Sequence, residues 1–97
     1  MMVPTSKKTK QVSLNYNIEI MHRILDALYE MGKSRITDTA VHSGLNHSTT
    51  KRYLNLMKIF NWIELGKEDG HIVLRLTETG IFIHNQLHDI IPDKGVS

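Results

Sequence analysis

The chain has 97 residues, of which 40% are hydrophobic and 23% are charged, a balance that predicts one compact domain. The absence of cysteine excludes disulfides, thiolate zinc ligands and cysteine nucleophiles. No apolar run approaches the length of a membrane span or the core of a secretory signal, so we expect a cytoplasmic, nucleoid-associated protein.

Positive charge is concentrated in the middle of the chain. Although the formal net charge is only +2, residues 33–61 hold five basic side chains and one acidic side chain. Residues 1–13 add three lysines and no acid, and their lack of apolar periodicity predicts a flexible basic arm. Charge of one sign gathered on a weakly charged protein is typical of a surface that binds a polyanion.

The first helix is predicted from apolar residues that recur at intervals of three and four between residues 18 and 31. Asn15 or Asn17 is expected to cap its start, and Gly32 is expected to end it in a left-handed conformation. Residues 34–36 are too few for a helix and are expected to be extended.

A short second helix is expected to begin at a cap of Thr37 or Asp38 and to end at Gly44, with Ala40 and Val41 facing inward.

The third helix is expected to run from His47 to about Phe60, between an N-cap at Asn46 and a left-handed residue at Asn61. Its core-facing residues are predicted from their helical spacing to be Thr50, Tyr53 or Leu54, Met57 and Phe60.

Residues 63–65 and 71–76 are predicted strands, joined by residues 67–70, in which Asp-Gly is a strong hairpin signal. A last helix is expected over residues 77–91, followed by a disordered tail at 92–97. The order is helix, short strand, helix, helix, hairpin, helix, which is a mainly α (α+β) winged helix-turn-helix architecture over residues 14–91.

The third helix carries a polar stripe opposite its apolar side. Ser48, Lys51, Arg52 and Asn55 fall at positions i, i+3, i+4 and i+7 and therefore share one face. Arginine and lysine donate to guanine, asparagine pairs with adenine, and serine can hold a phosphate. This face therefore has the chemistry needed to bind duplex DNA.

The segment Ser43–Met57 reads SGLNHSTTKRYLNLM and resembles winged-helix transcriptional regulators, particularly small archaeal ones. The resemblance covers about residues 18–91 and implies a three-helix core, a wing hairpin, DNA binding and a dimer. Two features depart from the family pattern. Asn61 stands where glycine is common, and Glu68 and Asp69 at the wing tip would repel phosphate, so the wing is expected to be a poor DNA contact.

These observations predict a DNA-binding transcriptional regulator that places residues 47–60 in the major groove of duplex DNA. The residues expected at the DNA are the polar and basic ones of the third helix, one arginine before it and the lysines of the arm: His47, Ser48, Thr49, Thr50, Lys51, Arg52, Asn55, Lys58, Arg35, Lys7, Lys8 and Lys10.

A homodimer is expected because the last helix carries more apolar residues than one face against a small core requires. The residues predicted at the dimer interface are Ile83, Leu87, Ile90 and Ile91.

His84 and His88 are four residues apart on the same helix and could present two imidazoles to zinc or nickel. Because two ligands do not make a site, we expect no metal and no cofactor. No set of residues combines a nucleophile, a base and an oxyanion donor, so neither an enzyme nor a small-molecule substrate is expected. The alternative function is a winged-helix module that docks to other proteins in a larger assembly.

Overall fold

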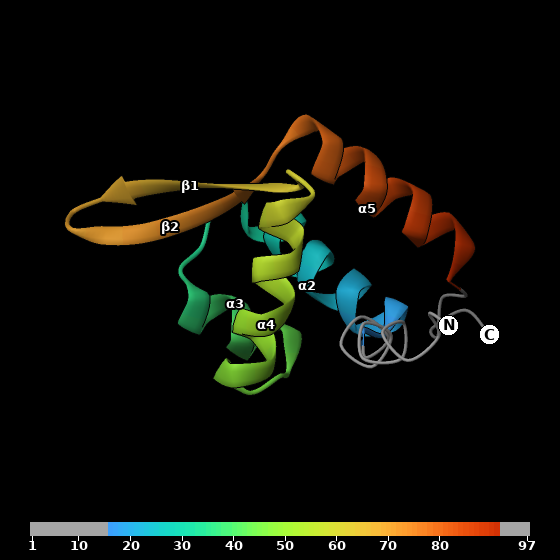
Figure 1. Ribbon diagram of the computed structural model, residues 1–97, viewed down its shortest axis with the longest axis horizontal. Helices are drawn as coiled ribbons and strands as arrows, with labels where there is room; N and C mark the ends of the chain where they lie inside the picture. The colour runs from blue at the N-terminus through green and yellow to red at the C-terminus, as the bar shows by residue number, and fades with distance from the viewer. Residues whose placement is uncertain (1–15, 92–97) are drawn as a thin grey trace, which may run out of the picture.

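The computed structural model describes residues 16–91 and has the predicted order of elements (Figure 1). The elements are α2 (Ile18–Met31), α3 (Ile36–Ser43), α4 (His47–Ile59), β1 (Ile63–Glu68), β2 (His71–Leu76) and α5 (Glu78–Ile90). The three helices α2, α3 and α4 form the body, α5 lies along one side and the β1–β2 hairpin projects away from the helices. The predicted arm (1–13) and tail (92–97) lie outside the described residues. No helix within residues 16–91 has the length and apolar content required to cross a membrane.

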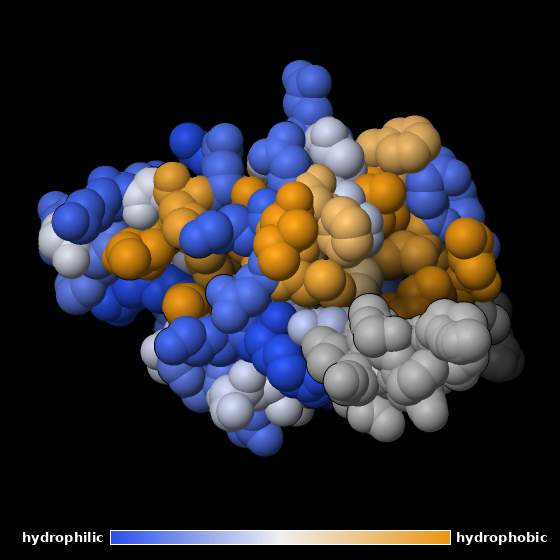
Figure 2. Space-filling view, viewed as in Figure 1, coloured by the Kyte–Doolittle hydropathy of each residue, from blue (hydrophilic) through white to orange (hydrophobic). Residues whose placement is uncertain are grey.

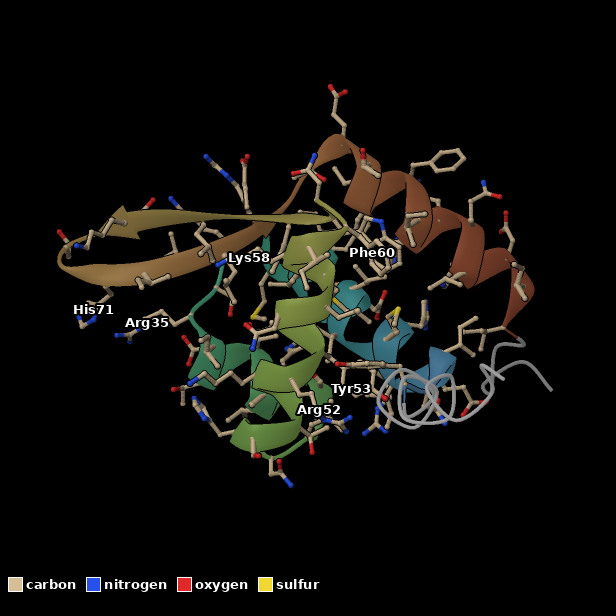
Figure 3. All side chains as sticks on the ribbon, viewed as in Figure 1. Arg35, Arg52, Tyr53, Lys58, Phe60 and His71 are labelled. Atoms are coloured by element: carbon tan, nitrogen blue, oxygen red, sulfur yellow. The ribbon has the colours of Figure 1, made fainter. Side chains whose placement is uncertain are left out.

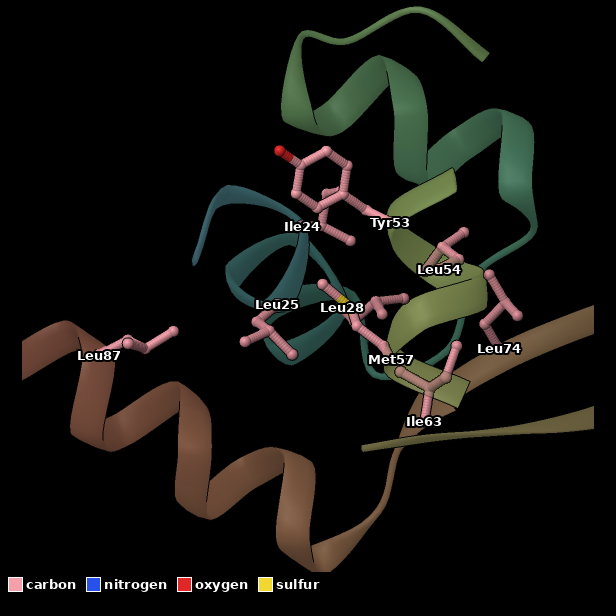
Figure 4. Close-up of a cluster of buried hydrophobic side chains, with 9 residues drawn as sticks. All are labelled: Ile24, Leu25, Leu28, Tyr53, Leu54, Met57, Ile63, Leu74 and Leu87. Atoms are coloured by element: carbon pink, nitrogen blue, oxygen red, sulfur yellow. The ribbon is translucent and has the colours of Figure 1, made fainter. Parts of the chain in front are cut away.

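The core lies where α2 meets α4, the base of the hairpin and α5 (Figure 4). Its buried members are Ile24, Leu25, Leu28, Tyr53, Leu54, Met57, Ile63, Leu74 and Leu87. The predicted apolar stripes on the first and third helices are therefore confirmed in their main positions. Because α4 is anchored to the core through one side only, its opposite side stays at the surface.

Polar caps define where the helices start. Of the two predicted candidates, Asn17 caps α2, and its side-chain oxygen accepts hydrogen bonds from the backbone N–H groups of Glu19 and Ile20. Asn46 caps α4 in the predicted way by accepting from the N–H of Thr49 at 2.7 Å. Asn61 has a φ of 62°, which confirms the predicted left-handed residue after α4.

The second helix differs from the prediction because hydroxyl groups, rather than aliphatic side chains, occupy part of its buried side. It begins at Ile36, earlier than predicted, and buries Thr39 as well as Ala40. The Thr39 hydroxyl is satisfied by donating to the carbonyl of Arg35 at 2.9 Å, so its burial costs little. Val41, predicted to face inward, is 75% exposed.

Phe60 is a further correction, since it follows the last residue of α4 and is exposed instead of facing the core. Its ring stacks on Trp62 with 5.2 Å between the ring centroids.

The hairpin is longer than predicted. Lys67 and Glu68 belong to β1 and pair with Ile72 and His71, so the predicted four-residue connection becomes a two-residue turn. Both residues of the Asp-Gly turn have positive φ, 51° and 78°, as the turn type that matches the twist of a hairpin requires. This register sets the position of every wing side chain.

The last helix packs more closely on the core than predicted. Its cap, Thr77, accepts from the N–H of Gly80, and its own N–H donates to the Trp62 carbonyl at 3.0 Å. Leu87, predicted at a dimer interface, is buried in the core of the single chain. Ile83 and Ile91 also pack against that core, which leaves only Ile90 of the predicted set fully at the surface.

Candidate nucleic-acid interface

The polar stripe predicted on the third helix lies on the outward face of α4 (Figure 3). Ser48, Lys51, Arg52, Asn55 and Lys58 are all exposed, and they alternate with the buried residues at helical spacing. The structure therefore brings these five predicted residues together on one continuous surface.

Thr50 is the predicted contact residue that the structure removes from this surface. Its side chain is fully buried, and its hydroxyl donates to the carbonyl of Asn46 at 2.9 Å. His47 is exposed and Thr49 is half-buried at the start of the helix, where backbone N–H groups and the helix dipole favour anions. The N-terminal turn of α4 can thus receive a phosphate through His47 and Thr49, but not through Thr50.

The charged side chains of α4 are all basic, and they have no acidic partner on the helix. The helix has three basic residues and no acidic residue. Among residues 16–91, neither Lys51 nor Lys58 takes part in an ion pair. A helix face with cations that have no carboxylate partner keeps its full attraction for a polyanion.

Arg52 is held in place by two aromatic rings. Its guanidinium carbon lies 5.3 Å from the ring centroids of both Tyr16 and Tyr53, within the range of a cation–π interaction. The two rings meet edge to face with 5.0 Å between their centroids. The hydroxyl of Tyr53 is fixed in turn by the backbone N–H of Asn17, 2.6 Å away. This pair of rings restricts the motion of the arginine before any ligand binds.

The turn between α3 and α4 depends on an arginine that the sequence did not single out. Arg23 of α2 donates to the carbonyl of Ser43 at 2.9 Å and so satisfies the C-terminal end of α3. Gly44 follows in the left-handed conformation, with φ of 72°. Arg23 and Ser43 are 20 residues apart, so no local pattern could reveal the contact. The contact ties α2 to the end of α3, just before the turn into α4.

Two acidic side chains of the wing are paired with cations. Arg75 lies 2.9 Å from Glu64 across the hairpin, and Lys33 pairs with Glu68 near the tip. The predicted repulsion from Glu68 is therefore partly offset, but the paired cations are less available to DNA as well.

Arg35 lies apart from the α4 stripe. Its Nε atom is 4.0 Å from a carboxylate oxygen of Asp38, and it lines a shallow pocket beneath the wing with Asp69 and His71 among its neighbours. This predicted contact residue thus belongs to the wing side of the surface.

A groove of about 110 Å³ separates α4 from the hairpin. Lys51, Asn55 and Lys58 line its α4 side, while the partly exposed Leu65 and Ile72 line its wing side. In Figure 2, the hydrophilic surface at the bottom of the view, over α3 and the start of α4, borders apolar side chains that lie above it. The polar rim and the apolar wall form one concave surface.

The sequence matches no protein-family model and no curated protein. Solved structures do resemble it. Sso10a-2, a DNA-binding protein from Sulfolobus solfataricus, has a TM-score of 0.70 and 21% identity over 78% of either chain. Oxidized MarR from E. coli has a TM-score of 0.67 and 15% identity over 73% of this chain and 52% of its own. The Zalpha domain of Carassius auratus PKZ, solved in complex with Z-DNA, has a TM-score of 0.55 and 29% identity over 61% of this chain and 94% of its own.

The chain spans about half the length of MarR. The identities are low, so the resemblance establishes the architecture. The protein has the winged helix-turn-helix fold that its sequence predicts.

Proposed function

We propose that the protein is a DNA-binding transcriptional regulator that places α4 in the major groove of duplex DNA. The observation that carries this proposal is the exposed face of α4, which joins three cations and an asparagine and has no carboxylate. Two proteins of similar structure support it, since Sso10a-2 is a DNA-binding protein and the Zalpha domain was solved with Z-DNA.

The side chains of α4 divide by the contacts that their chemistry allows. Asn55 suits adenine and Arg52 suits guanine, because each can form two hydrogen bonds to a base edge. Lys51 and Lys58 suit phosphates, which carry no sequence information but supply most of the affinity. The arm lysines Lys7, Lys8 and Lys10 remain predicted backbone or minor-groove contacts outside the described residues.

We further propose that the regulator binds as a homodimer. The support is apolar surface on the outer side of α5, where Phe82 is 60% exposed and Ile90 is 66% exposed. A second copy that covers these side chains would remove them from water and present two α4 helices to successive half-sites, about 34–36 Å apart.

The test is DNA binding measured at several salt concentrations, with a duplex selected from a random pool and with a scrambled duplex. With three or four phosphate contacts per chain, log K against log salt should have a slope of about −5 to −7 for the dimer. The complex should contain two chains per duplex, and Arg52→Ala should weaken the selected duplex more than the scrambled one.

Absence of DNA retention at low salt, or a flat salt response, would contradict the proposal. That result would favour the alternative of a protein-docking module.

A further inference from the structure

Three histidines and one aspartate converge where α5 packs on α2. His22 and Asp26 are one turn apart on α2, and His84 and His88 are one turn apart on α5. One ligand atom from each of the four side chains lies within 4.8 Å of all the others. None of these residues belongs to α4 or the hairpin, so the cluster is separate from the proposed DNA surface.

The buried member, His84, has an oxygen atom beside each ring nitrogen. Its Nε2 atom lies 2.8 Å from Asp26 Oδ1, and its Nδ1 atom lies 3.2 Å from Asn85 Oδ1. A neutral imidazole has a single N–H and can donate to only one of the two oxygens. A cation on the Nε2 side would satisfy Asp26 and leave the Nδ1–H to donate to Asn85.

The aromatic contacts hold these rings in place. His84 stacks on Tyr29 with 4.3 Å between the centroids and an interplanar angle of 12°. The centroid of His22 lies 5.5 Å from those of both His84 and His88, which are themselves 5.8 Å apart. Three imidazoles are thus gathered around one carboxylate.

We propose that His22, Asp26, His84 and His88 bind one divalent transition-metal ion of the zinc type. Imidazole and carboxylate are ligands that Zn²⁺ takes in tetrahedral sites, at about 2.0–2.1 Å from nitrogen. These bond lengths place the ligand atoms of a tetrahedral site about 3.3 Å apart. The separations here, 2.8 Å for His84–Asp26 and at most 4.8 Å overall, lie on either side of that value, so small side-chain rotations complete the site.

The site is structural in character. Four protein ligands fill a tetrahedral zinc ion and leave no open position for catalysis. The hydrogen bond from His84 Nδ1 to Asn85 would fix the ring for coordination through Nε2, as outer partners of zinc ligands usually do. Because two ligands come from each helix, the ion clamps α5 to α2.

The sequence alone does not predict this site, because α5 offers only two ligands, His84 and His88. The missing pair, His22 and Asp26, is about 60 residues away in the chain and is brought near only by the packing of α5 on α2.

The experiment uses the full chain without a histidine tag, stripped of metal by a chelator. Titration with Zn²⁺ against a chromophoric chelator measures the affinity and stoichiometry, and Co²⁺ reports tetrahedral coordination through its visible spectrum. One ion should bind per chain. Zn²⁺ at about 100 times its Kd should raise the Tm by about 10 °C or more, because the ion binds only the folded state.

His88→Ala is the main variant, because His88 is exposed and its loss leaves the core intact. His42→Ala is the matched control, since His42 also lies beside a carboxylate, 3.4 Å from Glu30, but outside the cluster. His88→Ala should weaken Zn²⁺ binding by more than about tenfold and remove most of the Tm shift, while His42→Ala should bind as the parent does. His22→Gln should reproduce the His88→Ala result from the other helix.

Equal Zn²⁺ affinity in the parent and in His88→Ala would overturn the proposal, as would equal losses in His88→Ala and His42→Ala. One ion per two chains would also overturn it, because the ion would then lie between copies. None of these readouts depends on DNA, so the site and the proposed function can fail separately.

Discussion

The helix α4 and the hairpin wing both carry basic side chains. Among the described residues, no lysine or arginine of α4 takes part in an ion pair, whereas Arg75 of the wing does. On the wing, Arg75 is paired with Glu64 and Glu68 is paired with Lys33. On α4, Lys51 and Lys58 have no carboxylate within salt-bridge distance in residues 16–91. The number of charged side chains in a segment therefore does not tell how many of them are free to bind a ligand.

The difference has a local origin. The strand register places Glu64 directly opposite Arg75, where side chains of opposite charge attract each other. The helix has no acidic residue at all, so the i, i+4 ion pairs common on helix surfaces cannot form there.

The largest effect is expected from a change that disturbs how the wing and α5 meet. A Cβ atom added at Gly80 would lie 2.0 Å from the backbone oxygen of Trp62, at the base of the hairpin. Gly80→Ala should therefore lower the free energy of unfolding by about 3 kcal/mol or more, because neither backbone can yield easily. Chemical denaturation of the parent and the variant measures this loss of stability.

Gly66→Ala is the control within the wing, since its Cβ would only touch Val73 at 3.6 Å. It should change the free energy of unfolding by less than about 1 kcal/mol. Similar losses in the two variants would show that the contact with Trp62 does not position the wing.

Removing two cations from each region tests the comparison directly. The double variant Lys51→Gln and Lys58→Gln should weaken DNA binding by about 2–3 kcal/mol, roughly 30- to 150-fold, and should flatten the salt slope. Lys67→Gln with Arg75→Gln removes the same charge from the wing and should cost less than about fivefold, because Arg75 is already paired and Lys67 stands beside the acidic residues Glu68 and Asp69 of the wing tip. Fluorescence anisotropy with one duplex measures both, and a greater loss from the wing pair would reverse the comparison.

An effect smaller than that of the α4 variant, and of opposite sign, is expected from releasing the two cations that wing carboxylates hold. Glu64→Gln with Glu68→Gln frees Arg75 and Lys33, and should strengthen DNA binding by about threefold to tenfold and steepen the salt slope. Both ion pairs are about half exposed, so the free energy of unfolding should change by less than about 1 kcal/mol. Unchanged DNA affinity together with unchanged stability would place the wing away from the DNA.

Much of the fold could be predicted because its signals are local. Asn17, Asn46 and Asn61 limit helices through hydrogen bonds or backbone conformations within a few residues. The polar stripe of α4 followed from helical spacing alone. The predictions failed where local pattern and tertiary packing disagree. Val41 and Phe60 are apolar yet exposed. Thr50 is buried as its helical spacing predicts, with its hydroxyl bonded to the carbonyl of Asn46, so it is its prediction as a DNA contact that is wrong.

By itself, then, the sequence determined the order of the elements, the ends of most helices and the charged face of α4, since all of these depend on neighbours along the chain. Only the tertiary structure decided which charges are paired, that Leu87 belongs to the core of a single chain, and that His22 and Asp26 join His84 and His88. Those outcomes depend on residues far apart in the chain, and their distances are set by the packing of α2, α5 and the hairpin.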